Sequence, residues 1–372
     1  MTPFAIAQPS RIRFGRGEAR KALPEIAALG RTALVVHGRD AARADWLVAG
    51  LRAEGLSVTA HASPREPTLA MLEAAVTLAR QAEVVIALGG GAAIDLGKAV
   101  AALAPAPGGA LDHLEVVGLG LPLQRAPVPF VAIPTTAGTG AEVTKNAVID
   151  VPEHRRKVSL RDDRMIAKLA VVDPSLTDFC PKAVTLASGL DAVVQVIEPY
   201  VSTRANPYTD ALCQAAIPMG LAALRLLMRG EDAGARDAMA WVSLSGGLAL
   251  ANAGLGAVHG LAGVIGGTTG AAHGAICGAL LPHVLRANAA RAPSARMAEV
   301  MGWIGAAFGA TDGLGALEEW MHDAGLPRLA ALGLSPADHA AVAEAACGAS
   351  SMKANPADLS ASDLVAILRA AG

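Results

Sequence analysis

Aromatic side chains are scarce in this chain of 372 residues. They make up 3% of the sequence, although 53% of the residues are hydrophobic. The interior must therefore be built from Ala, Leu, Val and Ile. A chain of this length is long enough for two domains of ordinary size.

Cysteine is also rare. The four cysteines stand at positions 180, 213, 277 and 347, and none forms a C-x-x-C pair. A disulfide framework is not expected in so large a core, so we expect reduced thiols. The N-terminus lacks a basic segment followed by an apolar run, so no signal peptide is evident. Together these features predict a cytoplasmic protein.

The chain has no excess of either charge. Its 31 basic and 33 acidic residues are interspersed, and the net charge is −2. Neither nucleic acid nor an anionic membrane is therefore indicated as a partner. Residues 238–285 contain no Asp, Glu, Lys or Arg, which a hydropathy scan would flag as a membrane span. Because the flanks lack an aromatic belt and basic clusters, we interpret this stretch as buried helices.

The two halves of the chain differ in their patterns. Short apolar runs alternate with helical patterns in the first half, at residues 33–37, 57–60, 84–88, 130–133 and 169–173. This alternation predicts a mostly parallel sheet covered on both faces. From Pro181 onward only helical periodicity is evident. We therefore predict an α/β dinucleotide-binding domain at residues 1–178 and an all-α domain at residues 179–372.

A glycine-rich loop follows the apolar run 84–88, in the sequence GGGAAIDLGK at 89–98. Glycines at a strand-to-helix junction let a phosphate approach the backbone, and the helix N-terminus offers free N–H groups. A tight turn without a ligand is the alternative. The loop departs from the usual dinucleotide fingerprint at Ile94, and from a P-loop at Ala92 and Ala99. Asp95 and Lys98 are expected to pair with each other, or to reach the sheet and the cofactor ribose.

A second loop, PTTAGTGAE at 134–142, follows the apolar run 130–133. Its glycines give backbone freedom and its threonines give hydroxyl donors, which alone is a weak signal for an anion or nicotinamide contact. Ligands of open α/β sheets lie beyond the carboxyl ends of the strands. We therefore expect both loops at one edge of the sheet.

Two histidines in the apolar stretch, His259 and His273, are separated by the sequence GGTTG at 266–270. We expect these glycines to break the helix, with His259 late on one helix and His273 in the first turn of the next. Packed core histidines are the alternative. Asp191 and Gln195 are four residues apart, so they share a helix face. These four side chains form a mixed N/O set suited to a divalent first-row metal.

These motifs together resemble the iron-containing (group III) alcohol dehydrogenase family, and the resemblance covers nearly the whole chain. Its specificity comes from the number and order of the motifs: PSRIRFG at 9–15, the two loops, DPSLT at 173–177, GLDAVVQVIEPYVS at 189–202, and the histidine segment ending in LLPHV at 280–284. The resemblance implies a dehydroquinate synthase-like fold with a Rossmann-like first domain, a nicotinamide cofactor, a divalent metal (Fe²⁺ or Zn²⁺) and a homodimer.

The resemblance also implies roles for individual residues. Cofactor contacts fall on Gly89, Gly90, Gly91, Ala92, Asp95, Thr135, Thr136, Thr139 and Lys157. The metal-ligand positions are Asp191, Gln195, His259 and His273, and we expect Asp191, His259 and His273 to be catalytic through the metal.

Two positions depart from the family pattern. The second ligand position is usually His, and here it is Gln195, whose carboxamide oxygen is a weaker ligand for Fe²⁺ or Zn²⁺ than imidazole. Metal affinity or metal preference is then expected to change, and a site that works without metal is also open. Many members carry another active-site His four residues after the first metal-ligand His, where this chain has Gly263. A proton relay must then use water, the cofactor ribose or another residue.

The choice of cofactor depends on the end of the first apolar run. Gly38 stands where an acidic residue would bind the ribose 2′-hydroxyl of NAD, and Arg39 can pair with the 2′-phosphate of NADP. Asp40, an acidic residue close to this position, would instead favour NAD. We predict that Gly38 and Arg39 contact the cofactor and that NADP is preferred, with NAD as the alternative.

The predicted function is hydride transfer between a nicotinamide cofactor and a small alcohol/aldehyde or ketone pair, with the metal polarising the substrate oxygen. Three alternatives remain open: maleylacetate reductase-type C=C reduction without metal, a dehydroquinate-synthase-like lyase, and a binding protein that has lost turnover. Both alternative enzymes need basic residues for anionic substrates, and residues 238–285 contain none. We expect Glu198 and His283 to be structural, and the histidines at 61, 113, 154, 322 and 339 to lie at the surface or in loops.

Overall fold

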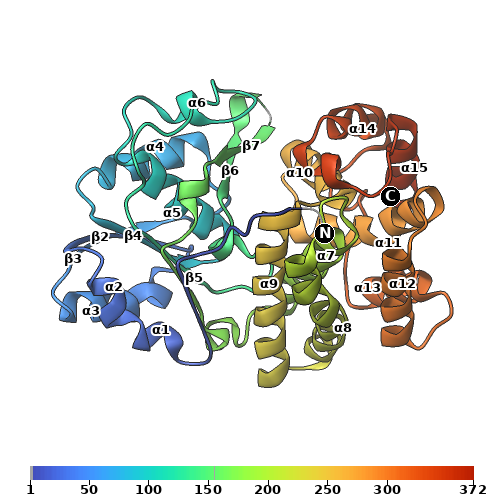
Figure 1. Cartoon of the computed structure of the whole chain (residues 1–372), viewed down its shortest axis with the longest axis horizontal. Helices are drawn as coiled ribbons and strands as arrows, with labels where there is room; N and C mark the ends of the chain where they lie inside the picture. Colours follow the sequence, from blue (N-terminus) through green and yellow to red (C-terminus); the bar gives the residue numbers. More distant parts are fainter. Residues whose placement is uncertain (1–2, 155) are drawn as a thin grey trace. The chain divides into compact units, whose positions relative to one another are not determined.

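The computed structural model describes residues 3–154 and 156–372, and the chain folds as two compact units (Figure 1). One unit comprises residues 7–136 and 140–178. The other comprises the N-terminal segment up to Ile6, residues 137–139 and residues 179–372. The predicted first domain had included both short segments, which instead belong with the second unit.

The first unit is built on a six-stranded parallel sheet, as the apolar runs predicted. The strand order is β1-β8-β5-β4-β2-β3, and every neighbouring pair is parallel. The strands are β1 (Arg11–Phe14), β2 (Thr32–His37), β3 (Ser57–Ala62), β4 (Val84–Gly89), β5 (Phe130–Pro134) and β8 (Leu169–Val172). With the helical second unit, this sheet confirms the predicted fold class.

Aliphatic side chains cover both faces of the sheet. In β4, Val85 and Ala87 belong to one buried cluster, whereas Val84, Ile86 and Leu88 belong to another on the opposite face. Since side chains alternate along a strand, a strand that is buried on both faces reads as a continuous apolar run. The helices of this unit are α1 (Glu18–Lys21), α2 (Leu23–Ala27), α3 (Asp45–Ala53), α4 (Leu69–Leu78), α5 (Gly91–Leu103) and α6 (Ala110–His113).

Three strands were not predicted. Strand β1 is a short edge strand whose side chains are partly exposed, so it carries no apolar run. Strands β6 (Asn146–Val151) and β7 (Arg156–Arg161) form a separate antiparallel pair. In both strands buried side chains such as Ile149 and Val158 alternate with more exposed ones, because only one face of the pair is covered.

The carboxyl ends of β2, β4 and β5 meet at one edge of the sheet. Strand β4 lies between the other two, with His37 opposite Leu88 and Gly89 opposite Pro134. The amide of Thr135 continues this pairing with a 2.9 Å hydrogen bond to the carbonyl of Gly89. The two predicted cofactor loops therefore leave the sheet side by side.

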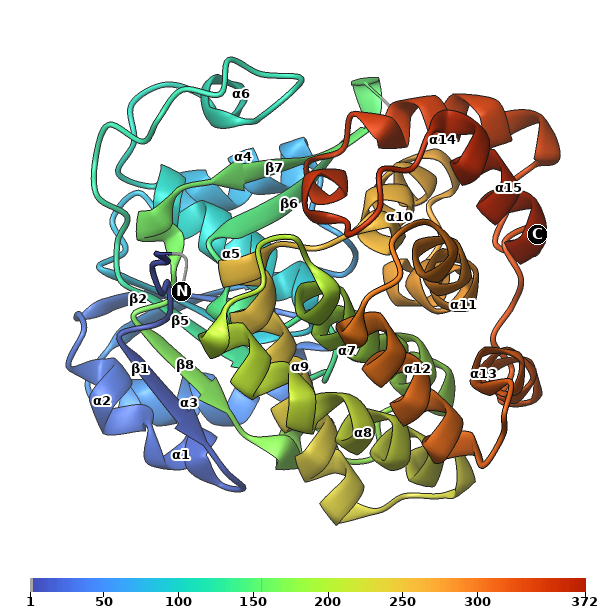
Figure 2. The same ribbon diagram turned by 45° about the vertical axis from the view of Figure 1, so that its right-hand side comes forward.

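The second unit is helical, and residues 179–372 contain no strand. Helix α7 packs against α8, α9 and α11 around a large aliphatic core (Figure 2). The helices are α7 (Lys182–Val201), α8 (Pro207–Arg229), α9 (Ala233–Ala253), α10 (Ala257–Thr269), α11 (His273–Arg291), α12 (Ala295–Phe308), α13 (Gly313–Asp323), α14 (His339–Cys347) and α15 (Ala361–Ala371).

The apolar helices of this unit belong to its core. Helix α8 is long and apolar enough to cross a membrane, but half of its apolar window is already buried within the protein. Helices α9 and α10 pass the same test only as a pair bent by 101°. Core helices of soluble enzymes have this composition, which agrees with the interpretation of residues 238–285 as buried helices.

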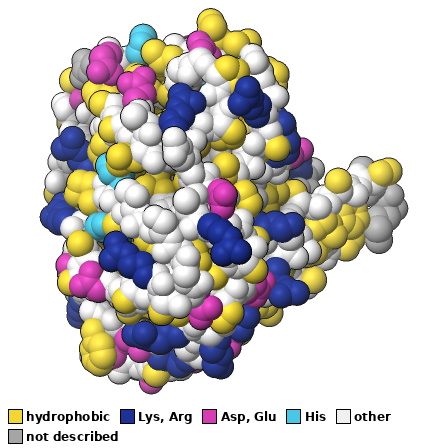
Figure 3. Space-filling view, turned by 90° about the vertical axis from the view of Figure 1, so that its left-hand side faces the viewer, with side chains coloured by type: hydrophobic (Ala, Val, Ile, Leu, Met, Phe, Trp, Pro, Cys, Tyr) yellow, Lys and Arg dark blue, Asp and Glu magenta, His cyan; other side chains and the backbone are white. Residues whose placement is uncertain are grey.

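On the face drawn in Figure 3, basic and acidic side chains are interspersed.

Candidate active site

The chain around the two histidines turns at a different place from the one predicted. Helix α10 runs through Gly266 and Gly267 to Thr269 and ends at Gly270, whose φ of 69° is left-handed. His259 therefore lies in the first turn of α10 and not late on it, whereas His273 begins α11 as predicted. Gly266 is buried and Gly267 partly buried, and neither breaks the helix; the positive φ of Gly270 ends it.

Glycines bring α11 and α9 close to α7. A Cβ built on Gly274 would lie 2.2 Å from the carbonyl oxygen of Ala187 and 3.2 Å from the Cβ of Asp191. A Cβ on Gly246 would lie 3.0 Å from the Cβ of Gln195. The absence of side chains at these glycines allows the backbones to approach the segment that carries Asp191 and Gln195.

This packing brings Asp191, His259 and His273 together. The Nε2 of His259 lies 3.3 Å from Asp191 Oδ1, and the Nε2 of His273 lies 3.8 Å from the same oxygen. The two imidazole rings are 5.4 Å apart between centroids. The side chain of His273 is 35% exposed, whereas those of Asp191 and His259 are buried. The cluster is therefore buried on one side and open at His273.

Glu198, which was predicted to be only structural, contacts the cluster. Its Oε2 lies 2.6 Å from His259 Nδ1, and its Oε1 accepts a hydrogen bond of 2.7 Å from the amide of Val258. The carboxylate thus holds the first turn of α10 and one nitrogen of His259. With Nδ1 held by Glu198, Nε2 is the nitrogen of His259 that faces Asp191.

Three buried polar atoms in this region have no hydrogen-bond partner among the described residues: Asp191 Oδ1, Gln195 Oε1 and His259 Nε2. Leaving such atoms unpaired costs about 1–3 kcal/mol each. In a tetrahedral site with bonds near 2.1 Å, two N or O ligands lie about 3.4 Å apart. The spacing of 3.3 Å from His259 matches this value, and the spacing of 3.8 Å from His273 is slightly longer. The donor set therefore fits a divalent metal, and the metal would supply the missing partners.

The electrostatics of the cluster favour a cation. Burial by itself would lower the pKa of both imidazoles, but Cys277 together with the nearby carboxylates outweighs it. The pKa of His259 is raised well above its usual value, and that of His273 is raised to about 9. Burial would raise the pKa of Asp191, yet the two histidines lower it. Positive charge is thus drawn to this cluster.

Cys277 also lies in the cluster and was missed as a site residue. Its Sγ is 3.6 Å from His273 Nε2, and the side chain is buried. One ligand atom from each of Asp191, His259, His273 and Cys277 lies within 4.8 Å of the others. The spacing of four residues between His273 and Cys277 on one helix was the available signal.

Other histidines are placed differently from the predictions. His113 and His339 are buried, although both were expected at the surface or in loops. His283 is buried with its Nε2 3.7 Å from Glu318 Oε1, which fits a structural role. Gly263 stands in open space, since a Cβ built on it would meet nothing within 4 Å.

The glycine-rich loop is shaped by the close approach of three strand ends. A Cβ on Gly89 would lie 2.6 Å from the Cβ of Ala93 and 3.4 Å from the amide nitrogen of Gly38. A Cβ on Gly90 would lie 3.2 Å from the hydroxyl oxygen of Thr136. Only glycine fits at position 89, which keeps the backbone of this loop bare for a ligand.

Helix α5 begins directly in this loop. Gly90 is its N-cap, and no side chain of the described residues caps it. The amides of Ala93 and Ile94 donate to the Gly90 carbonyl, whereas Gly91 and Ala92 form the opening of the helix. An uncapped helix N-terminus beside glycines suits the pyrophosphate of a dinucleotide.

Polar residues near this loop also hold the hairpin β6–β7. Asp95 Oδ2 accepts a 3.0 Å hydrogen bond from the amide of Val148. Lys98 is buried, and the charge of Asp95 acts on it. Its ammonium donates to the Ala141 carbonyl, the Thr144 hydroxyl and the Asn146 carbonyl at 2.7–2.8 Å. Lys98 therefore reaches the chain after β5.

The remaining predicted cofactor residues have distinct surroundings. Lys157 in β7 forms an ion pair with Glu66. A Cβ on Gly38 would meet nothing within 4 Å, so space is open at the end of β2. The guanidinium of Arg39 is exposed and lies 3.3–3.4 Å from the carbonyl of Pro64. Thr139 belongs to the second unit. Cofactor contacts by these residues stay predictions.

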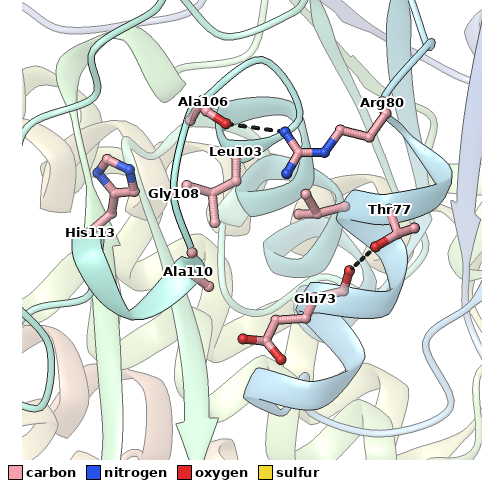
Figure 4. Close-up of a pocket in the computed structure, with 10 residues that line it drawn as sticks. Glu73, Thr77, Arg80, Leu103, Ala106, Gly108, Ala110 and His113 are labelled. Carbon is pink, nitrogen blue, oxygen red and sulfur yellow. Dashed lines mark hydrogen bonds between the residues drawn. The ribbon is translucent and has the colours of Figure 1, made fainter.

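A separate pocket of about 150 Å³ lies between α4, the C-terminal end of α5 and α6 (Figure 4). Arg80 and His113 line it, and Arg80 donates to the carbonyls of Ala104 and Ala106. This pocket adjoins the end of α5 opposite the glycine-rich loop. It is therefore distinct from the predicted cofactor site.

A parallel α/β unit with an uncapped glycine-rich loop, together with a helical unit whose buried polar cluster fits a divalent metal, is the architecture expected of a metal- and nucleotide-dependent oxidoreductase. Comparisons with known proteins agree. The family model "Iron-containing alcohol dehydrogenase" matches residues 9–174, and the model "Fe-containing alcohol dehydrogenase family, C-terminal" matches residues 185–372. The chain belongs to the iron-containing alcohol dehydrogenase family, whose members use NAD(H) and a divalent metal, as the sequence resemblance implied.

Individual relatives span a range of named substrates. The chain is 35% identical to long-chain-alcohol dehydrogenase 1 of Geobacillus thermodenitrificans, over 88% of this chain and 86% of that one. It is 31% identical to the NAD-dependent methanol dehydrogenase of Bacillus methanolicus, with 99% of both chains covered. The crystal structure of a 1,3-propanediol oxidoreductase superposes with a TM-score of 0.90 at 30% identity, covering all of both chains. The predicted class of oxidoreductase is thus confirmed, whereas the substrate differs among relatives.

Proposed function

We propose that this chain catalyses reversible hydride transfer between a nicotinamide cofactor and a small alcohol/carbonyl pair. The carbon-bound hydrogen of the alcohol leaves as hydride to the nicotinamide, and the hydroxyl proton is released, so that a carbonyl and a reduced cofactor form. The observation that carries the proposal is the convergence of unpartnered Asp191 Oδ1 and His259 Nε2 with His273.

The residues that would hold the metal are Asp191, Gln195, His259 and His273. A divalent ion there supplies Lewis acidity that polarises the substrate oxygen. Asp191 contributes negative charge, and Glu198 holds Nδ1 of His259 so that Nε2 is the nitrogen directed toward Asp191. His273 is the exposed member, so the substrate oxygen is expected beside it. Gly263 has no side chain to accept the released proton, which therefore passes to water.

The residues that would hold the cofactor lie at the carboxyl edge of the sheet. Gly89, Gly90, Gly91 and Ala92 offer backbone N–H groups to the pyrophosphate, and Thr135 and Thr136 offer hydroxyls beside them. The open space at Gly38 supports acceptance of a 2′-phosphate, so NADP is proposed to be used along with NAD. We further propose a homodimer in the cytoplasm, consistent with four cysteines that form no disulfide.

The test is a cofactor-reduction assay on the purified protein reconstituted with Fe²⁺ or Zn²⁺. A panel of ethanol, 1-butanol, 1,3-propanediol and methanol would be oxidised with NAD and NADP, and lactaldehyde would be reduced with NADH and NADPH in the reverse direction. His273→Ala is expected to lose both bound metal and turnover. Full turnover by a folded, metal-free His273→Ala variant would contradict the metal role, and reduction of maleylacetate alone would contradict the substrate class.

A further inference from the structure

Cys277 occupies a position that the four expected metal ligands do not explain. It lies on α11 one turn after His273, and its Sγ is 3.6 Å from His273 Nε2. Helix α11 packs closely against α7 because Gly274 and Gly278 have no side chains. A Cβ at either position would collide with Ala187, Asp191 or Leu190. Residues 273 and 277 each directly precede one of these glycines. The thiol is therefore held on the side of α11 where Asp191 lies.

The spacing of the sulfur suits a metal ligand. In a tetrahedral zinc site the Zn–S bond is about 2.3 Å and the Zn–N bond about 2.0–2.1 Å, so the S and N atoms lie about 3.6 Å apart. The Sγ of Cys277 and the Nε2 of His273 have this separation. The sulfur also lies within 4.8 Å of the ligand atoms of Asp191 and His259. Four atoms from three helices thus converge on one point.

The sequence gives a reason for a substitute ligand. Gln195 stands where the family resemblance places an imidazole, and a carboxamide oxygen is a weak donor for Zn²⁺. A thiolate is a strong one and is itself anionic. With Asp191 it brings two negative charges to a dication, so the metal and its four ligands together are neutral. The other buried cysteine, Cys213, has different surroundings: burial and Asp210 raise the pKa of its thiol, as expected for an inert core thiol.

We propose that Cys277 is a ligand of the metal, in a set made of Asp191, His259, His273 and the Cys277 thiolate. This inference rests on the metal site proposed above. On binding, the thiol proton of Cys277 is released to solvent and a sulfur–metal bond forms, with no change of oxidation state. Cys277 thereby takes the fourth position that the proposed function gives to Gln195, and Gln195 becomes a neighbour of the metal. Because thiolate ligands favour zinc, the site is expected to prefer Zn²⁺ over Fe²⁺.

The test uses cobalt as a spectroscopic substitute for zinc. The full-length protein is stripped with a chelator and titrated with Co²⁺. A thiolate ligand produces an intense sulfur-to-cobalt charge-transfer band in the near ultraviolet, which N and O ligands do not produce. The wild type is expected to show this band at one equivalent. Cys277→Ser is expected to lose it, whereas Cys347→Ser, which changes an exposed cysteine, is expected to keep it.

Affinity and structure provide readouts independent of activity. Competition with a chelator is expected to show that Cys277→Ser and Cys277→Ala bind Zn²⁺ at least ten-fold more weakly than the wild type, on the scale of the 10–100-fold losses caused by disturbing ligand support. X-ray absorption at the zinc edge of the wild type is expected to show one sulfur scatterer at about 2.3 Å. That measurement requires no variant and so does not depend on how Cys277 variants fold.

The outcomes separate the two proposals. Stoichiometric Co²⁺ binding without the charge-transfer band, together with a zinc edge that shows only N and O scatterers, would overturn the role of Cys277 and leave the metal site intact. A wild-type protein that binds neither Co²⁺ nor Zn²⁺ would overturn both proposals.

Discussion

Glu198 and His259 are held together across two helices, with Oε2 of the carboxylate 2.6 Å from Nδ1 of the ring. The opposite nitrogen of the ring faces Asp191 at 3.3 Å. The same carboxylate accepts from the amide of Val258 at the start of α10, where the helix dipole favours negative charge. One acidic residue therefore fixes both the helix and the orientation of its histidine.

Replacing Glu198 with Gln should weaken metal binding without unfolding the protein. The carboxamide can still accept from the Val258 amide, but it no longer makes His259 a stronger donor, so affinity for Zn²⁺ should fall by about 10–100-fold. Isothermal titration or chelator competition measures this. Glu318→Gln is the matched control, because Glu318 faces His283 in the same unit but outside the cluster. Equal affinities for Glu198→Gln and the wild type would show that Glu198 acts only on helix α10.

Gln195→His should strengthen metal binding. Position 195 lies one turn after Asp191 on α7, and its side-chain oxygen is buried without a partner among the described residues. An imidazole there adds a better ligand than a carboxamide. We expect at least a ten-fold gain in Fe²⁺ affinity, measured by metal content after dialysis against a chelator series. Gln195→Leu, of similar volume without a donor atom, is the control, and a gain in both variants would mean that the ligand atom is not responsible.

Gly274→Ala should disturb the site by packing alone. The added Cβ would lie 2.2 Å from the Ala187 carbonyl, so α11 must move away from α7 and carry His273 with it. We expect a loss of about 1–3 kcal/mol in the free energy of unfolding, together with weaker metal binding. Gly302→Ala on α12 is the control, because its Cβ would meet nothing within 4 Å. Gly302→Ala should increase the free energy of unfolding by about 0.5–1 kcal/mol. Urea unfolding compares the two, and equal stabilities would refute the close approach.

The sequence patterns predicted the sheet well but predicted the metal cluster only in part. The runs at 33–37 and 84–88 were unambiguous because strands buried on both faces contain no polar interruption. Strand β1 and the pair β6–β7 were missed because each has an exposed side. His259 was placed at the wrong end of its helix because glycines 266 and 267 were taken as breakers, although packing holds them in α10.

Contacts between distant helices could not be foreseen from local spacing. Glu198 and His259 are 61 residues apart, and their pairing depends on the bend between α9 and α10. The position of Cys277, four residues after His273, was a local indication of a shared site. However, a lone cysteine in an apolar stretch is usually interpreted as a core residue. Lys98 was expected to pair with Asp95 or to reach the sheet and the cofactor ribose, but local spacing did not reveal that the chain after β5 supplies three acceptors for its ammonium.

Gly38→Asp should shift cofactor use toward NAD. Space is open beside Gly38 at the end of β2, so the new carboxylate fits without a clash. It would bind the ribose 2′-hydroxyl of NAD and repel the 2′-phosphate of NADP. The ratio of kcat/KM for NAD over NADP should rise at least ten-fold, about 1.4 kcal/mol. Gly38→Ala should leave the ratio unchanged. An unaltered ratio in Gly38→Asp would mean that the ribose lies elsewhere.

Lys98 and Glu142 should give the stability a dependence on pH. Burial raises the pKa of Glu142 to about 7, against its own backbone hydrogen bond and the charge of Lys98. Burial also lowers the pKa of Lys98 to about 8, against the charges of Asp95 and Glu142. Between about pH 4.5 and 7 the folded state holds a proton on Glu142 that the unfolded state has lost, so this contribution to stability falls as pH rises.

The sign reverses for Lys98. Between about pH 8 and 10.5 the unfolded state holds a proton that the folded state has lost, so stability from this group rises with pH. The two groups together should give a minimum in the free energy of unfolding near pH 7–8. Urea unfolding midpoints across pH 5–10 measure it.

Two variants test which residue causes the fall and which causes the rise in stability with pH. Glu142→Gln should remove the decline below pH 7. Lys98→Met should remove the rise above pH 8 and cost about 3 kcal/mol throughout, because three acceptors, two of them buried, lose their donor. Lys145→Met is the control, since Lys145 pairs with the exposed Asp163 and such surface pairs contribute about 0–1 kcal/mol. If Glu142→Gln and the wild type had the same profile from pH 5 to 7, Glu142 would be ionised in the folded protein, and Lys98 would then be its buried counter-ion.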